Sequence, residues 1–212
     1  MYQAEGNLQE SAKLLIDVDE RTASGMAFER KLNQLRLERN HAEAIRLLQA
    51  RRAQVPSACD GFEMFHLAFA QRLVGDTAGA KITAEEARNT LEPLCKEQPD
   101  MPDPELGLAL AYAVLGDRDS ALKEAERAMM LVPSAKDAVH RPGYEEILAL
   151  IQTVLGENSR AISTLTQLLK MPYGSLIYGP APVTPALLWL DPIWDPLRGD
   201  PAFQKLCEEK KP

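Results

Sequence analysis

The chain has 212 residues, of which 45% are hydrophobic and 26% are charged, and its formal net charge is −7. A negative charge repels nucleic-acid phosphates and anionic membrane surfaces, and no basic patch offsets it, so we expect no nucleic acid and no membrane contact from this segment. The three cysteines are odd in number and far apart in sequence, which excludes a complete internal disulfide framework.

The first twenty residues have the pattern of half a helical hairpin. Gly6-Asn7 is followed by residues 8–18, like the turn and second helix of a repeat whose first helix would precede Met1. A terminal repeat with an unpaired apolar face is unstable in water. We therefore predict a partial N-terminal repeat at 1–20, and we expect either a fragment of a longer protein or a partner that supplies the missing helix.

A repeated unit follows. Glycine recurs at Gly75, Gly116 and Gly156, at spacings of 41 and 40 residues, with an alanine five positions after each and a leucine-alanine pair seven and eight positions before. Glycine can take the left-handed backbone conformation that ends a helix, and the small alanines allow two helix backbones to approach closely. The pattern predicts a helix–turn–helix unit, and a degenerate earlier copy has Asn40 at its turn.

Four such units are predicted within residues 21–172, which makes the fold class all-α. Their approximate bounds are 22–56, 57–97, 102–133 and 137–172. In the third, Asp117 can cap the second helix and Pro133 prevents that helix from continuing. Each unit should contact its neighbours, as in a solenoid.

The composition changes at Met171: eight of the fifteen prolines and both tryptophans lie in the last 42 residues. Prolines at 180, 182 and 185 exclude a regular helix there. A short helix or turn is predicted at 187–192, and a helix at 202–209 after Asp200-Pro201. Residues 173–212 are thus predicted to be a proline-rich connector with C-terminal cap helices.

The third unit resembles the tetratricopeptide repeat family. The matching residues are Leu108, Ala109, Tyr112, Ala121, Ala128 and Pro133. Glu105 and Ala125 depart from the pattern, because the family often has tryptophan and a large aromatic residue at these positions. The resemblance implies a right-handed superhelical solenoid of helical hairpins with a C-terminal capping segment. Residues 190–203 are also similar to the block that ends such arrays in bacterial multidomain proteins, commonly after a Ser/Thr protein kinase, nucleotide cyclase or winged-helix domain.

The sequence contains no recognisable catalytic or metal-binding motif. His41, His66 and His140 are scattered and form no metal-binding pair. Gly174 and Gly179 have the outer spacing of a phosphate loop, but Pro180-Ala181 follows where lysine and a hydroxyl residue are needed. We therefore expect no enzyme activity, no metal and no cofactor.

In stacked hairpins of this family the first helices line a concave groove, so residues off their packing faces are candidates for partner binding. The predicted groove residues are Glu29, Asn33, Arg36, Phe65, Phe69, Arg72, Leu106, Leu110, Glu146 and Leu150. The apolar middle should not stay in water, because burial of each large apolar side chain contributes about 1.5–3 kcal/mol. It also lacks the polar and basic residues that the family uses to clamp a C-terminal carboxylate.

Three occupants of the groove are open: ordinary packing within a curled array, which leads, the chain's own tail, and a partner peptide. The tail's candidate anchors are Trp189, Leu190, Ile193 and Trp194, because aromatic and branched side chains bring large apolar area. The rival role of the tail is a cap on the last repeat, over Ile162, Leu165 and Leu169, and the cap is preferred.

The sequence thus predicts a noncatalytic protein–protein interaction module or scaffold, as a fragment of a larger bacterial signalling or regulatory protein. The alternative is a self-association module that positions attached catalytic domains as a homodimer. The longest nearly apolar stretch, 106–116, is about half of the roughly 20 residues that a membrane span needs. The cytoplasm is slightly favoured as compartment, and the periplasm remains open if a span lies upstream.

Overall fold

The computed structural model describes residues 2–18, 25–54, 61–133 and 139–208. These residues form an all-helical fold without a β-strand, apart from one isolated antiparallel bridge between Ser175 and Gly179. None of the described helices is long and apolar enough to cross a membrane. The ends of the predicted N-terminal repeat and of the predicted tail, at 19–20 and 209–212, lie outside the described residues.

Most of the helices come in consecutive antiparallel pairs. Their bounds are α1 (Leu8–Leu14), α2 (Gly25–Leu37), α3 (His41–Gln54), α4 (Gly61–Leu73), α5 (Thr77–Glu97), α6 (Pro102–Leu115), α7 (Arg118–Leu131), α8 (Arg141–Val154), α9 (Asn158–Leu168), α10 (Pro185–Leu190), the 3-10 helix η2 (Pro192–Leu197) and α11 (Pro201–Glu208). One pair falls within each of the four predicted units, from α2–α3 to α8–α9.

The turns within the pairs show why glycine recurs. Gly75, Gly116 and Gly156 have φ angles of 84°, 79° and 76°, a left-handed region that side chains with a Cβ rarely adopt. In the first pair the left-handed residue is Arg39, with φ of 58°, and the predicted turn residue Asn40 follows it. Asn40 accepts a hydrogen bond from the Glu43 amide at 3.4 Å, so it caps the start of α3.

The N-terminal helix is shorter than predicted. The expected helix over 8–18 ends at Leu14, with Leu15 as its C-cap. Leu14 and Ile16 are 72% and 74% exposed, so the apolar residues at this end have no described packing partner. Both ends of α1 are held by α2, because Gln34 Nε2 donates to the Leu8 carbonyl at 2.8 Å and Lys31 Nζ donates to the Leu15 carbonyl at 3.0 Å. Extending the helix further would bury no apolar surface, which explains the early end.

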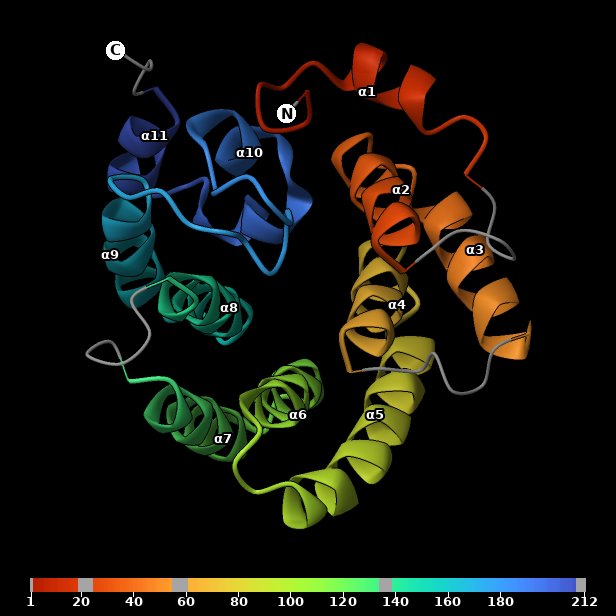
Figure 1. Ribbon diagram of the computed structural model, residues 1–212, viewed down its shortest axis with the longest axis vertical. Coiled ribbons are helices and arrows are strands. Elements are labelled where there is room, and N and C mark those ends of the chain that lie inside the picture. The colour runs from red at the N-terminus through yellow and green to blue at the C-terminus, as the bar shows by residue number, and fades with distance from the viewer. Residues whose placement is uncertain (1, 19–24, 55–60, 134–138, 209–212) are drawn as a thin grey trace.

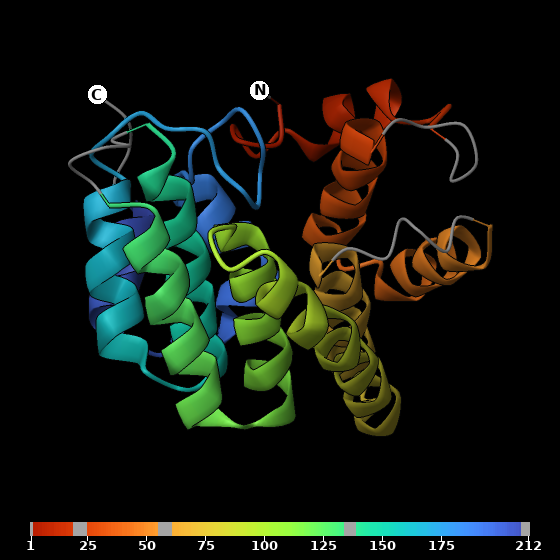
Figure 2. The same ribbon diagram turned by 60° about the horizontal axis from the view of Figure 1, so that its bottom comes forward.

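The pairs follow one another around a ring, so that the C-terminal segment returns to the N-terminal residues (Figure 1). Within the ring, α6 and α8 lie nearer the centre than their partners α7 and α9 (Figure 1). Turning the molecule shows α6 to α9 standing side by side, with the N-terminal pairs on the other side (Figure 2). Thr184 Oγ1 closes the ring by donating to the Ala4 carbonyl at 2.7 Å.

The centre of the ring is occupied by the tail, which we define as residues 173–208. The largest core cluster joins Leu106 and Leu110 of α6 and Leu150 of α8 to Ile193 and Trp194 of the tail. A smaller cluster fills the space among α2, α3 and α4 around Phe28 and Leu48. We call the surface of α2, α4, α6 and α8 that faces the tail the concave face.

Candidate functional site

A buried ion pair lies at the centre of the concave face. The Arg36 guanidinium, on α2, contacts the Asp191 carboxylate, which caps η2, with Nε 3.0 Å and 3.1 Å from the two carboxylate oxygens. Arg36 is 6% exposed and Asp191 0%. Moving two charges out of water costs several kcal/mol per ion, so such a pair persists only when further hydrogen bonds satisfy it.

Those hydrogen bonds come from the tail. The Tyr178 hydroxyl donates to Asp191 Oδ2 at 2.9 Å and accepts from Trp194 Nε1 at 2.9 Å. The Ile193 amide donates to Asp191 Oδ1 at 3.1 Å. Burial, and then the neighbouring Asp191 carboxylate, raise the pKa of Tyr178 well above its ordinary value, so the hydroxyl keeps its proton and remains a donor.

Side chains of α2 also hold the main chain of the tail. Asn33 Nδ2 donates to the Ile177 carbonyl at 2.8 Å, and Arg30 Nη1 donates to the Tyr178 carbonyl. Two adjacent carbonyl groups of an irregular segment thereby receive the hydrogen bonds that a strand or helix would otherwise supply. The concave face therefore contacts this segment through its backbone as well as through its side chains.

His66, on α4, completes the polar group around Arg36. Its Nδ1 lies 3.2 Å from Arg36 Nη1. Because a guanidinium only donates, Nδ1 must accept, which places the proton of the neutral ring on Nε2. Burial, followed by the charge of Arg36, lowers the pKa of His66 to about 3, so the ring is neutral at physiological pH.

Glu146, on α8, anchors the start of the tail. Its Oε2 accepts a hydrogen bond from Ser175 Oγ, and Ser175 Oγ in turn accepts from the amides of Ile177 and Tyr178 at 3.0 Å and 2.7 Å. Burial raises the pKa of Glu146 to about 7, although hydrogen bonds from Ser175 and Tyr173 oppose that shift. This carboxyl group thus titrates near physiological pH inside the core.

The structure brings most of the predicted groove residues to the tail. A residual gap of about 10 Å³ is lined by Arg36, Phe65, Leu110, Leu150 and Ile193, among others, so little space remains between the two surfaces. The tail is therefore the occupant of the central groove. Ordinary packing within the array, which was the leading interpretation, does not account for these contacts.

The tail also covers the last helix pair. Phe203 and Leu206 of α11 belong to the same core cluster as Ile162 and Leu165 of α9, with Leu169 packed against it. The preferred cap interpretation thus describes α11, but not the earlier part of the tail. One continuous segment fills the groove through Ile177, Tyr178 and η2, and covers α9 through its final helix.

Four of the predicted residues lie elsewhere. Trp189 is 58% exposed, with the Arg198 guanidinium 5.0 Å from its ring centre, so its prediction as a groove anchor is wrong. Leu190 is half-buried beside Gly6 at the N-terminal segment. Glu29 is exposed, and Phe69 is half-buried and stacks on Phe65 with ring centres 5.6 Å apart.

Sequence reasoning missed Asp191, Tyr178, Ser175 and His66 as members of this cluster. One usable signal was present for Asp191, an acid within an otherwise apolar run that contains both tryptophans. A carboxylate in such a run must be paired if the run is buried. No local spacing indicated its partner, because Arg36 is 155 positions away.

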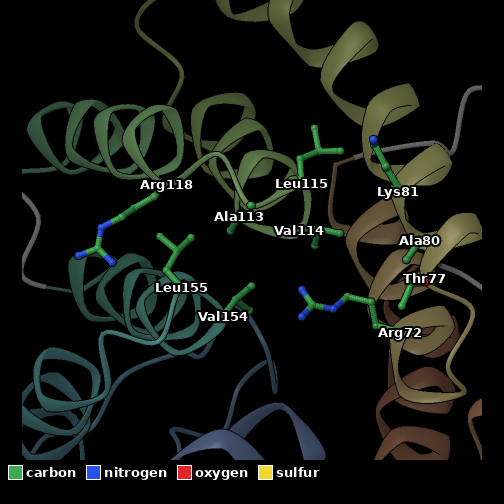
Figure 3. A pocket seen from close by; sticks show the side chains of 11 residues that line it. Arg72, Thr77, Ala80, Lys81, Ala113, Val114, Leu115, Arg118, Val154 and Leu155 are labelled. Atoms are coloured by element: carbon green, nitrogen blue, oxygen red, sulfur yellow. The ribbon is translucent and has the colours of Figure 1, made fainter.

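A second feature of the concave side is open. A pocket of about 450 Å³ lies where α4, α6 and α8 end and where α5 and α7 begin, and we call it the hairpin-end pocket (Figure 3). It is lined by Arg72, Thr77, Ala80, Lys81, Ala113, Val114, Leu115, Gly116, Arg118, Val154 and Leu155. Arg72, like Glu29, is thus a predicted groove residue that the tail leaves uncovered.

No family model matches the chain, and no curated protein sequence matches it. Among the described residues no group of three or more His, Cys, Asp or Glu side chains is placed to hold a metal ion. The features available for a functional interpretation are therefore the tail-filled groove and the hairpin-end pocket.

Proposed function

We propose that the chain is a noncatalytic protein–protein interaction module or scaffold of the tetratricopeptide type, from a larger bacterial signalling or regulatory protein. The observation that carries this proposal is that the concave face already binds an irregular, turn-containing segment, the chain's own tail. Asn33 and Arg30 donate to consecutive main-chain carbonyls, and the ring of Trp194 is completely buried.

These contacts are of the kinds that bind peptides. Hydrogen bonds to main-chain carbonyls give affinity for a segment whatever its side chains, and buried aromatic side chains anchor it in place. The ion pair between Arg36 and Asp191 fixes the position of the tail along the groove, because a shifted carboxylate would leave the guanidinium unpaired. A concave face with this chemistry supports a peptide-binding role for the array.

The tail restricts where a partner can bind. Phe65 and Leu110 are buried beneath it, so they are not available to a partner in this conformation. The accessible regions are the hairpin-end pocket and the outer faces of α3, α5 and α7. A partner is therefore expected to contact the hairpin-end pocket or one of these outer faces.

Site-specific photo-crosslinking tests this proposal. A photoreactive amino acid would replace Lys81 in the hairpin-end pocket, Ile82 on the outer face of α5, or Lys123 on α7, all exposed positions. We expect one bacterial protein to be crosslinked reproducibly at some of these positions, and excess unlabelled chain to compete it away. Adducts at background level from every position would contradict an interaction module.

The second candidate function is self-association, and the exposed apolar end of α1 favours it. Leu14 and Ile16 lie within two residues of each other and are both largely exposed. Pairing of two such ends would bury area that each chain leaves in water. Light scattering over a range of concentrations tests it: a dimer that a Leu14→Ser/Ile16→Ser double variant abolishes supports this candidate, and a monomer at all concentrations excludes it.

A further inference from the structure

The hairpin-end pocket has a charge opposite to that of the chain. The chain has 31 acidic against 24 basic side chains, yet the charged residues that line this pocket are Arg72, Lys81 and Arg118. The described residues that line it include no carboxylate. A concave site with one sign of charge and apolar walls concentrates ligands of the other sign.

Two of the three cations have no partner among the described residues. Arg118 forms an ion pair with Glu157. Arg72 and Lys81 are exposed, and within the described part of the chain neither forms an ion pair or a hydrogen bond. The acids of the adjacent turns, Asp76 and Asp117, are engaged as helix caps by the amides of Gly79 and Ser120.

The shape of the pocket fits a carboxylate next to apolar groups. Arg72 extends from α4 across the pocket towards Val154 of α8, while Lys81 stands on α5 (Figure 3). Ala113, Val114 and Val154 supply apolar surface. A guanidinium binds a carboxylate through two parallel hydrogen bonds, and an apolar wall beside it favours a hydrophobic neighbour in the same ligand.

We propose that the hairpin-end pocket binds an acidic segment of a partner protein, with one glutamate or aspartate side chain on Arg72, a second acidic side chain on Lys81, and apolar residues against Val114 and Val154. This inference rests on the proposed interaction function and gives it a ligand class. A nucleic acid fits less well, because the pocket has no aromatic ring on which a base could stack and the whole chain is acidic.

Fluorescence anisotropy on the full chain tests the proposal. The probe is a fluorescein-labelled peptide of alternating glutamate and leucine with an amidated C terminus, and its control replaces every glutamate by glutamine. We expect the acidic peptide to bind at least roughly tenfold more tightly, because only it can form the charge-assisted hydrogen bonds. We expect its affinity to fall as salt is added, because the pocket is open to solvent.

Charge reversal locates the binding. Arg72→Glu and Lys81→Glu should each weaken the acidic peptide by roughly tenfold or more, since each replaces an attraction by a repulsion. Lys96→Glu is the matched control: Lys96 is an exposed lysine in the last turn of α5, outside the pocket, and its reversal changes the net charge equally. Its affinity should stay within about twofold of that of the unmodified chain.

Several outcomes would overturn the proposal: equal binding of both peptides, unchanged binding by Arg72→Glu, or an equal loss in Lys96→Glu, which would show a general charge effect. Displacement of the peptide by a single-stranded oligonucleotide at low concentration would assign the pocket to nucleic acid instead. If the peptides fail while a partner crosslinks at Ile82 or Lys123, the pocket proposal is wrong and the interaction module stands.

Discussion

The concave side of this molecule has two regions, one closed and one open. In the centre, Arg36 is buried against Asp191, and Phe65 and Leu110 are covered by the tail. A short distance along the same helices, at the hairpin ends, Arg72 is exposed and unpaired within the described residues. Both regions present an arginine beside apolar side chains, but only the first is occupied.

The difference lies in what a charge costs when it is buried. Arg36 can leave water because Asp191, Tyr178 and His66 surround it with acceptors and further hydrogen bonds. Arg72 has no such partner and stays hydrated. The centre is therefore a completed interface that stabilises the fold, and the hairpin-end pocket remains free to form an interface with another molecule.

The largest expected effect comes from breaking the central pair. Asp191→Ala should reduce the free energy of unfolding by about 3–5 kcal/mol, because it leaves the Arg36 guanidinium buried without a counter-ion. Urea denaturation followed by circular dichroism measures the loss. The same substitution also removes the acceptors for Tyr178 and Ile193, which adds to the effect.

A nearby exposed pair provides the matched control. Asp195 contacts Arg39 at 2.7 Å, and both side chains are substantially exposed. Asp195 also contacts Arg198 at 2.6 Å, but because these side chains are partly exposed to water, Asp195→Ala should cost only about 1 kcal/mol. Equal losses in the two variants would mean that the central pair is not buried as described.

The two tryptophans of the tail allow a comparison of a side chain that fills the groove with one that lies on the surface. Trp194→Ala should cost about 3–5 kcal/mol, because the ring is fully buried and its Nε1 donates to Tyr178. Trp189→Ala should cost less than about 1 kcal/mol, since the ring is mostly exposed. Thermal denaturation compares them, and a stable Trp194→Ala variant would show that the tail does not fill the groove.

The helix pairs could be predicted because each depends on local chemistry. Glycine at a left-handed turn and aspartate at the next cap are visible in sequence, as at Gly116 and Asp117. The left-handed conformation of Arg39 could not be found in this way, because a residue with a Cβ seldom takes that conformation. The length of α1 was overestimated because a periodic pattern does not show whether a packing partner exists.

The central site could be predicted only in part. The family resemblance implied that the first helix of each pair lines one concave surface, and Asn33 and Arg36 of α2 do contact the tail. The segment that covers that face is more than 140 positions away in the sequence. The local spacing of residues gives no information about such distant contacts. Trp189 and Trp194 are chemically alike, and their different burial follows from the turn between α10 and η2.

The pH dependence of stability tests whether the tail covers Glu146. The pKa of this carboxyl group is raised to about 7 in the folded chain, above its ordinary value, so the folded state holds the proton more tightly. Its contribution to stability is present at low pH and is lost as pH rises from about 4.5 to about 7. The loss should be on the order of 1–3 kcal/mol.

Glu146→Gln isolates this contribution. His66 acts in the opposite direction below about pH 6.5, because its pKa is lowered to about 3, so its contribution increases as pH rises. Urea denaturation at pH 5 and pH 8 should therefore show a smaller fall, or a rise, in the glutamine variant than in the unmodified chain. Identical pH profiles of the two proteins would mean that Glu146 is accessible to water and that the tail leaves it uncovered.

The smallest expected effect concerns the open region. Arg72→Ala should change the free energy of unfolding by less than about 0.5 kcal/mol, because the side chain is exposed and forms no ion pair within the described residues. At the same time it should weaken binding of the acidic peptide, a loss that Lys96→Ala should not show. Arg72 would then contribute to ligand binding and not to folding, as expected of a residue in a binding site. If Arg72→Ala instead destabilised the chain by more than about 1 kcal/mol, Arg72 would belong to the folded framework, and the two regions of the concave side would not differ as proposed.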